Sequence, residues 1–465
     1  MKKFVKPIAL ILVVFSFLFL FSCNKDGKQK TNRPSVFEKK REIRLPYSKQ
    51  DGLNPYFAKT RINYNLFPLM YESLVKLDSD YSANKVLAKN IENKGYYLDV
   101  QVDGKKFSPY DVVYSFYMAK RSPLYAPTLV NVDKAMAYNG DTVRFTLIKP
   151  RKFAENALTF PIVKSKTADR KENLPEGTGM YSLSNDNLVK NRNSSEKPLT
   201  EKISLFDINK DSALYYGMQV GNLDAYYDPL ISGNLKTSPT QRAAISTTNL
   251  VALTFGPRLS ITPDQKKYIS YSIDREKFKN EGFSGHLNAS NLPYHKGIPE
   301  VCKFYKKQGT PNELKDKIGN FTDKEYSLIY CNDNTVKANS GTVIAKQLLN
   351  SGIKIKAEAL SYSEYMSRLK SGRYDFALVE IKLTQEIDLT PVISDKNFLN
   401  IYESFERKTI STEAFIKAYY DNLPFITLGY KNGVLVYSRQ IKENISANET
   451  NVYDGFNNWY ITENK

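Results

Sequence analysis

The sequence predicts an α/β fold, because strand-like and helix-like segments alternate along the chain. Its 465 residues exceed the usual length of a single domain, so we expect two domains or one domain with large insertions. Hydrophobic residues make up 41% of the chain and charged residues 25%, which is close to the average of globular proteins. This composition argues against wholesale disorder, a collagen-like chain and a protein with many membrane spans.

The N-terminal segment has the order of a secretory signal peptide. Three lysines precede an apolar run over Pro7–Phe21, which is short for a bilayer span of about 20 residues. Leu20-Phe21-Ser22-Cys23 then resembles the lipobox of bacterial lipoproteins, in which the cysteine is lipid-modified and becomes the mature N-terminus. We therefore expect a signal peptide over 1–22, lipid on Cys23 and a flexible tether over 23–43. The alternative is an uncleaved N-terminal anchor, and either way the chain is exported and tethered to a membrane, facing the periplasm or the cell exterior.

The formal net charge is +18, with 67 Lys and Arg against 49 Asp and Glu. Export, together with the lack of a zinc-finger, RNP or Lys/Arg-block pattern, excludes nucleic acid as a partner. The basic residues are scattered, which is typical of a solvated surface. The sequence also lacks a Ser/His/Asp order, a Gly-rich phosphate loop and an HExxH motif, so we expect neither an enzyme nor a cofactor.

The individual elements follow from the spacing of apolar residues and from capping residues. In the first part of the chain we expect a strand over 43–47, a helix over 65–77, a helix that begins after Ser108 with Pro109 in its first turn, and a strand over 142–148. In the last third we expect strands over 326–330, 353–355 and 374–379, with helices over 343–349 and 365–369 between them. This β-α-β-α-β order predicts a doubly wound sheet.

Eight motifs follow one another between about Leu45 and Tyr460. They are Leu53-Asn54-Pro55, LMYESLVKLD at 69–78, FSPYDVVYSF at 107–116, PEGTGMY at 175–181, ALYYGMQVGNLD at 213–224, YISYSIDRE at 268–276, LKSGRYD at 369–375, and LPFI at 423–426 with GVLVY at 433–437. In this order they resemble the family 5 extracellular solute-binding proteins, the peptide- and nickel-binding lipoproteins that serve ABC importers. Most of the motifs also have a purely structural interpretation, such as a turn at Gly177-Thr178-Gly179.

The resemblance implies a two-lobe, type II periplasmic-binding-protein-like fold, with mixed sheets, flanking helices and a central ligand cleft. Lobe I would comprise 44–250 with 426–465 returning to it, and lobe II 251–425, with hinges near 248–255 and 425–430. The implied function is a monomeric, lipid-anchored receptor that delivers an oligopeptide or similar solute to an ABC permease by lobe closure. The alternatives are a ligand-sensing or peptide-chaperone lipoprotein without dedicated transport, and an adhesin or structural lipoprotein.

The segment that sets ligand specificity in peptide binders of this family differs here. After the YDFAL strand, Ile381 stands where the family has Trp, and Thr384 stands where an Asp pairs with the peptide amine. A free α-ammonium in a closed cleft needs a carboxylate, which Glu380, Glu386 or Asp388 could provide. The ligand-binding candidates are Phe57, Thr60, Glu380, Lys382, Thr384, Glu386 and Asp388.

Two pairs of residues leave alternatives open. Cys302 and Cys331 remain as thiols once Cys23 is lipidated, and in an oxidising compartment they form either a disulfide or two separate thiols. His286 and His295 flank a loop and are either ligands of a metal chelate or surface residues. With so few His and Cys in the chain, we expect no resident metal site.

Overall fold

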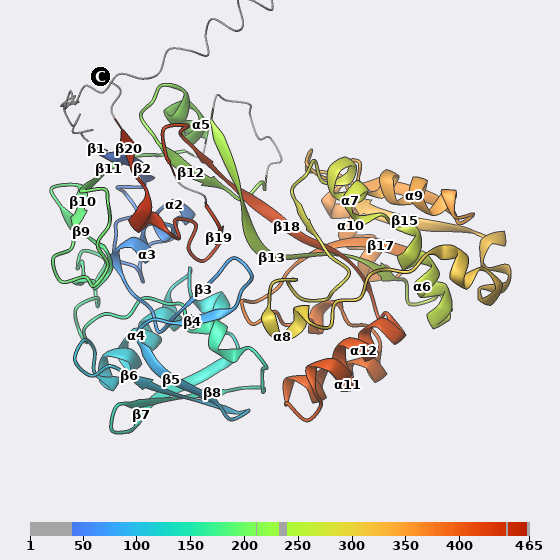
Figure 1. Ribbon diagram of the computed structural model, residues 1–465, viewed down its shortest axis with the longest axis horizontal. Helices are drawn as coiled ribbons and strands as arrows, with labels where there is room; N and C mark the ends of the chain where they lie inside the picture. Colours follow the sequence, from blue (N-terminus) through green and yellow to red (C-terminus); the bar gives the residue numbers. More distant parts are fainter. Residues whose placement is uncertain (1–39, 211, 232–239, 443–444, 463–465) are drawn as a thin grey trace, which may run out of the picture. The chain divides into compact units, whose positions relative to one another are not determined.

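Two long antiparallel strands, β13 (Gln241–Phe255) and β18 (Ile426–Tyr437), run side by side through the molecule and join its two halves (Figure 1). The computed structural model describes residues 40–210, 212–231, 240–442 and 445–462. The predicted signal peptide, Cys23 and most of the predicted tether lie outside these residues. Every residue of β18 is buried, so this strand is covered on both faces and along its whole length.

The strands β13 and β18 belong to a mixed eight-stranded sheet with the order β12-β18-β13-β17-β15-β16, to which β14 and β19 add pairs. Its other strands are β12 (Ala225–Asp228), β14 (Leu287–Ala289), β15 (Glu325–Cys331), β16 (Lys354–Leu360), β17 (Phe376–Lys382) and β19 (Ala447–Asn448). Strand β15 pairs in parallel with β16 and with β17, whereas β13 pairs antiparallel with β17. The predicted β-α-β-α-β order is therefore confirmed, within a sheet that also holds antiparallel strands.

Lobe II, as we use the name, is the part of the chain between β13 and β18. Two separate groups of buried apolar residues fill it, one on each side of β13 and β17. Helices α9 and α10 are the crossovers between the parallel strands, and α11 and α12 pack against each other. Its helices are α6 (Pro263–Ser272), α7 (Arg275–Lys277), α8 (Pro299–Cys302), α9 (Ser340–Asn350), α10 (Tyr362–Ser371), α11 (Lys396–Glu406) and α12 (Thr412–Asn422).

Lobe I comprises the elements before β13 and the chain after β18, which share one large apolar core. One four-stranded sheet has the order β2-β11-β10-β9 and another has β5-β6-β8-β7. The strands of these sheets and of two smaller ones are β1 (Lys40–Arg41), β2 (Ile43–Tyr47), β3 (Val75–Leu77), β4 (Ala83–Lys85), β5 (Ala88–Asn93), β6 (Tyr97–Val102), β7 (Val132–Asn139), β8 (Thr142–Leu147), β9 (Tyr181–Ser184), β10 (Asn187–Lys190), β11 (Lys202–Asp207) and β20 (Ile461–Thr462). The helices are α2 (Arg61–Tyr64), α3 (Phe67–Met70), α4 (Pro109–Arg121) and α5 (Ser212–Gln219).

Helix α4 begins where its capping residues predict. The Ser108 side chain accepts a hydrogen bond from the Asp111 backbone N–H, and the Asp111 carboxylate accepts one from the Ser108 N–H. Asp111 also accepts hydrogen bonds from the backbone and hydroxyl of Ser165, and these bonds outweigh its burial and hold its pKa at about 2. The motif therefore fixes the helix start and ties α4 to a distant loop.

Two expectations about local structure are wrong. The predicted helix over 65–77 is instead α3 followed by β3, because the backbone of Gly179 donates to the Met70 carbonyl at 3.0 Å and the chain becomes extended at Tyr71. Its apolar residues are buried by several elements rather than by one helix face. The end of the predicted tether is also ordered, because Lys40–Arg41 pairs with Ile461–Thr462.

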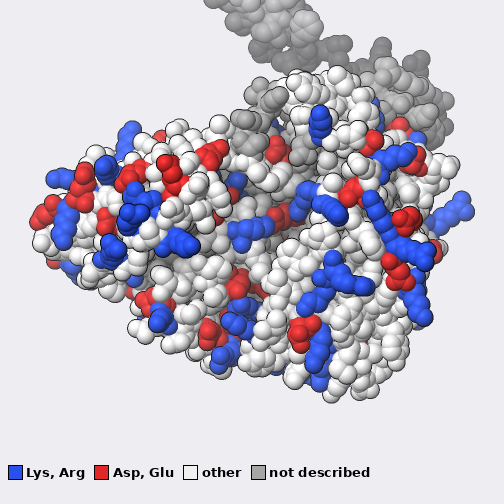
Figure 2. Space-filling view, turned by 180° about the vertical axis from the view of Figure 1, so that it is seen from behind, with Lys and Arg blue, Asp and Glu red and all other residues white. Residues whose placement is uncertain are grey.

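Charged residues of both signs are interspersed over the face shown in Figure 2, as the scattered lysines predict. Among the described residues, none of the helices is long and apolar enough to cross a bilayer.

We predict that Gly179→Ala destabilises the protein, because a Cβ at this position would lie 2.5 Å from the Met70 carbonyl carbon and 2.7 Å from the Leu69 carbonyl oxygen. These contacts are backbone atoms and cannot move aside cheaply, so the free energy of unfolding should fall by about 2 kcal/mol or more. Urea denaturation measures the change. Gly104→Ala is the matched control, because a Cβ there meets no atom within 4 Å. Equal stability of the two variants would contradict the close packing of this turn.

Candidate functional site

A cavity of about 580 Å³ lies between the lobes, at the middle of the β13–β18 pair. Lobe I contributes Arg61, Tyr227 and Glu449, and the central strands β13 and β18 contribute Asn249 and Lys431. Lobe II supplies most of the remaining wall, namely Cys331, Asp333, Asn334, Lys337, Tyr362, Glu380 and Lys382. We call this the cleft cavity. Its volume is in the range of small-molecule sites.

Lys431 anchors the charged groups of the cleft cavity. It lies in the middle of β18 with only 5% of its side chain exposed, and its ammonium donates to Glu380 at 3.2 Å and to the Leu230 carbonyl at 3.3 Å. Glu380, on β17, also pairs with Lys337 at 2.5 Å. Burial of Glu380 acts to raise its pKa, but the two ammonium groups outweigh this and the pKa is lowered. Glu380 is therefore an ionised carboxylate in the cleft.

Glu449 forms a second charged group, on the lobe I side. Its carboxylate pairs with Lys382 of β17 and accepts hydrogen bonds from the Tyr81 hydroxyl at 3.0 Å and the Thr248 N–H at 3.1 Å. Thr248 lies in an irregularity of β13, where Ile245 pairs with Gly433 and Asn249 with Lys431, so its N–H is free of the ladder. Burial acts to raise the pKa of Glu449, but Lys382 and Arg61 outweigh this and lower it. The Lys382–Glu449 ion pair joins the lobes.

Arg61 lies in the part of the cleft-cavity wall that lobe I supplies. Its guanidinium lies over the rings of Tyr64 at 4.7 Å and Tyr227 at 5.2 Å, and it donates to the Glu449 carbonyl oxygen. Its Nε is buried without a partner among the described residues. Arg61 begins α2, whose N-cap is Thr60.

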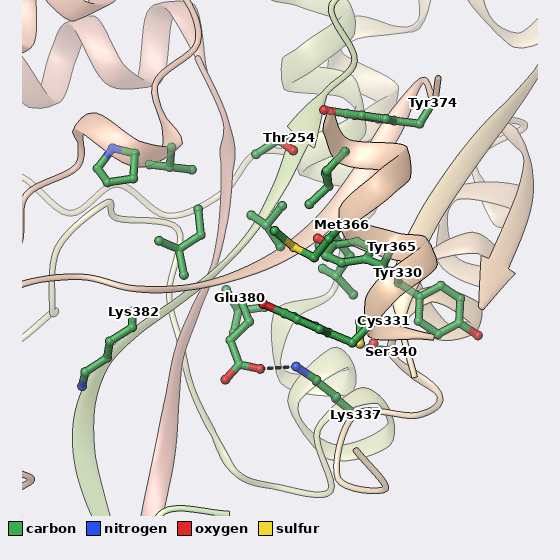
Figure 3. A pocket seen from close by; sticks show the side chains of 18 of the residues that line it. Thr254, Tyr330, Cys331, Lys337, Ser340, Tyr365, Met366, Tyr374, Glu380 and Lys382 are labelled. Carbon is green, nitrogen blue, oxygen red and sulfur yellow. Dashed lines mark hydrogen bonds and ion pairs between the residues drawn. The ribbon is translucent and has the colours of Figure 1, made fainter. Parts of the chain in front are cut away.

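A second cavity of about 530 Å³ continues from the cleft cavity into lobe II. The two share Cys331, Lys337, Tyr362, Glu380 and Lys382. Figure 3 shows Glu380 bonded to Lys337 at one side of this cavity, with the rings of Tyr330 and Tyr365 and the thioether of Met366 nearby on the lobe II side. The connected space thus offers charged groups at the lobe boundary and apolar groups beyond them.

The seven ligand-binding candidates do not lie together in one site. Glu380 and Lys382 line the cleft cavity. Phe57 packs against the lobe I core, Thr60 caps α2 and accepts from the Asn63 N–H, and the Thr384 hydroxyl accepts from the Asp388 N–H at 3.4 Å. The remaining two, Glu386 and Asp388, lie at a different contact between the lobes.

Sequence reasoning missed Arg61, Tyr227, Lys431 and Glu449 in the cleft cavity. Lys431 did carry a signal, because a lysine inside the otherwise apolar segment ITLGYKNGVLVY is expensive to bury without a partner. Nothing in the sequence marked Glu449, because the C-terminal segment that carries it reaches β13 only in the folded chain.

The other contact between the lobes holds three acids. Arg151 of lobe I pairs with Asp388, the Asn131 amide donates to Glu386 at 3.4 Å, and the Lys152 N–H donates to Glu406 at 2.8 Å. Glu386 and Glu406 are 1% and 3% exposed. Burial raises the pKa of Glu386 to about 8 and that of Glu406 to about 7.

The structure bears on the alternatives left open for the two cysteines and for His295. Cys302 and Cys331 are both free, because Cys302 is exposed on α8 and its thiol donates to the Pro299 carbonyl, while Cys331 ends β15 beside the cleft. In this structure they are separate thiols, and their pairing in an oxidising compartment stays a prediction. His295 is not a surface residue: it is 1% exposed and stacked between Tyr81 at 4.8 Å and Tyr430 at 3.9 Å. Burial lowers its pKa to about 3, so it is neutral.

The sequence model of the bacterial extracellular solute-binding proteins, family 5 middle, matches residues 102–383, which is more than half of the chain. The protein belongs to this family. Its members are extracellular solute-binding proteins of ABC importers. The family resemblance given by the eight motifs is therefore confirmed. Among the described residues, no group of three or more His, Cys, Asp or Glu side chains could hold a metal ion.

Solved structures of family 5 binding proteins confirm the two-lobe fold. The unliganded open form of the periplasmic murein tripeptide binding protein MppA matches with a TM-score of 0.70 at 15% identity, over 92% of this chain and 98% of that one. A nickel ABC transporter from Bacillus halodurans matches with a TM-score of 0.68 at 15% identity, over 89% and 98%. CtaP, a substrate binding protein from Listeria monocytogenes, matches with 0.63 at 16%, over 91% and 100%. No curated protein matches this chain.

We predict that Glu386 makes the protein less stable as the pH rises. Its pKa in the folded protein, about 8, lies above the ordinary value of 4.5, so the folded state binds a proton that the unfolded state has lost. This contribution is complete below pH 4.5 and is lost as the pH rises through 8. Glu386→Gln keeps the neutral form and should remove a pH-dependent loss of up to about 5 kcal/mol between these limits.

Urea denaturation across this pH range measures the effect. Glu403→Gln is the control, because Glu403 is exposed on α11 and makes only a surface pair with Arg407. A Glu386→Gln variant whose stability falls with pH as steeply as that of the unmodified protein would contradict a buried, protonated Glu386.

Proposed function

We propose that the protein is a lipid-anchored, extracytoplasmic receptor that delivers an oligopeptide or similar solute to an ABC importer by lobe closure. The observation that carries the proposal is the cleft cavity, which both lobes line around the central strands. A ligand in this place contacts groups that move relative to each other when the lobes rotate. It can therefore bind the closed state more tightly than the open one, which is what drives closure.

The charges of the cleft suit a solute that carries both signs. Arg61 and Lys382 could meet a carboxylate, while Glu380 and Asp333 could meet an ammonium group. Thr384 does not take the place of the family's Asp, because it serves a local turn with Asp388. We therefore expect Glu380 to be the carboxylate that faces a peptide amine. The apolar space between Tyr330, Tyr365 and Met366 could hold a side chain.

We predict that a solute co-purifies with the protein. Native mass spectrometry followed by denaturing extraction should find one or more small peptides, and members of a broad peptide panel should raise the melting temperature. Absence of any bound solute, together with no shift from the panel, would contradict the proposal. A ligand that binds in a cell without a permease partner would favour the sensor or chaperone alternative.

Lys382→Ala should weaken the binding of that peptide about fivefold or more, because it removes a charged group from the cleft wall and breaks the ion pair with Glu449. Lys370→Ala is the matched control, because Lys370 is exposed on α10 outside the cavity. Isothermal titration calorimetry with each variant measures the difference. If both variants lost peptide affinity equally, the peptide would not bind in the cleft cavity.

We predict that Cys23 carries lipid. Phase separation in Triton X-114 should send the unmodified protein to the detergent phase, and Cys23→Ser should move the exported protein to the aqueous phase or leave its precursor unprocessed. Cys302→Ser is the control, because that thiol lies on the exposed surface of lobe II. Retention of the Cys23→Ser protein in the detergent phase with its signal intact would favour an uncleaved anchor.

A further inference from the structure

Lobe I holds a cavity of its own, with a volume of about 560 Å³. Helices α2 and α3, strands β3 and β4 and the C-terminal segment 450–457 supply most of its wall. Of the described residues that line it, none belongs to lobe II and none also lines the cleft cavity. We call it the lobe I cavity.

The lobe I cavity and the cleft cavity lie on opposite sides of one thin wall. Arg61 and Glu449 line the cleft cavity, while their neighbours Tyr64 and Thr450 line the lobe I cavity. The Arg61 guanidinium lies over the Tyr64 ring at 4.7 Å and donates to the Glu449 carbonyl oxygen. The two cavities share no described lining residue, so we treat them as separate spaces.

Three buried tyrosines in the wall have hydroxyls without a partner among the described residues. Tyr64, Tyr125 and Tyr453 are 6%, 2% and 1% exposed, and none of their hydroxyls takes part in a hydrogen bond there. Tyr71, in the same wall, shows the usual arrangement, because its hydroxyl donates to the Leu53 and Pro175 carbonyls. Their hydroxyl oxygens are not among the fully buried atoms without a partner, so they face the cavity and are open to a ligand.

The amide group of Asn451, in the same wall, is not open to the cavity. Its oxygen is fully buried without a partner among the described residues, and its nitrogen donates to Asp454 at 3.3 Å. Burial raises the pKa of Tyr125 well above its ordinary value, so its hydroxyl stays a neutral donor. The lobe I cavity thus offers phenol groups, which both donate and accept hydrogen bonds.

Charges at the cavity are paired with each other. Lys106 lies 3.0 Å from Glu72, and Lys76 lies 3.1 Å from Asp454. An anionic ligand would therefore face acids as well as lysines. An apolar ligand would leave the phenols unbonded, at a cost for each group. A ligand with several hydroxyl groups can both donate to the phenol oxygens and accept from them.

We propose that the lobe I cavity is a second binding site, for an uncharged, hydroxyl-rich ligand of the size of a mono- or disaccharide. Aromatic rings in the wall suit the apolar faces of a sugar ring, and the cavity volume is in the range of small-molecule sites. The site does not depend on the solute of the cleft cavity, because the two walls share no described residue.

The test uses the full-length protein and defined probes. Isothermal titration calorimetry with glucose, N-acetylglucosamine, maltose and cellobiose should give a dissociation constant below about 1 mM for at least one of them. Glucose 6-phosphate should bind more weakly than glucose. Failure of all four sugars at about 10 mM would overturn the proposal, as would tighter binding of the phosphate ester.

Substitutions in the wall of the lobe I cavity test whether the sugar binds there. Tyr125→Phe and Tyr453→Phe should each weaken sugar binding about fivefold, because each removes one hydrogen-bonding group from the wall. Since these hydroxyls bond to no described residue, the melting temperature without ligand should stay within about 2 °C of the unmodified protein. Tyr110→Phe, on the exposed face of α4, and Lys382→Ala, in the cleft cavity, should leave sugar binding unchanged. Loss of sugar binding in Lys382→Ala but not in the tyrosine variants would overturn the assignment.

Discussion

Strand β18 pairs with β13 along most of its length, and the rest of the molecule is arranged around this pair. In lobe I the other edge of β18 pairs with β12, and in lobe II it pairs with β14. All twelve residues of β18 are buried, so layers of both lobes must cover it. The cores of the lobes are therefore not independent: each contains residues of the same two strands, such as Leu435 in lobe I and Tyr430 in lobe II.

Burying a whole strand also decides where the charges of the cleft lie. Lys431 cannot reach bulk water from the centre of β18, so its ammonium needs an acid on a neighbouring element, and Glu380 of β17 provides it. Glu380 in turn holds Lys337. Glu449 is fixed in the same way by a backbone N–H that an irregularity of β13 leaves unpaired. The electrostatics of the cleft cavity thus follow from sheet geometry rather than from the segment after β17.

Features encoded by neighbouring residues were predictable from the sequence, whereas features encoded by distant pairing were not. The start of α4 at Ser108 and the β-α-β-α-β order of lobe II depend on local spacing and capping, and both are found. The prediction of a helix over 65–77 failed because Gly179, more than a hundred residues away in the sequence, bonds to Met70 where α3 ends. Glu386 and Asp388 fit the composition of a ligand site but face Asn131 and Arg151 instead, since only the fold determines which lobe I surface they meet.

The irregular pairing of β13 with β18 has a consequence for the order of events in binding. Only the pairs Asn249–Lys431, Leu250–Tyr430 and Val251–Gly429 lie between the two register shifts. A rotation of the lobes that keeps the sheet intact must have its axis near these pairs. Groups on the axis, such as Lys431, hardly change position, so a solute can meet them before the lobes close. Lys382 pairs with Asn249 in the sheet and already forms an ion pair with Glu449 of lobe I, so these two charges also lie beside the axis and hardly move apart when the lobes rotate.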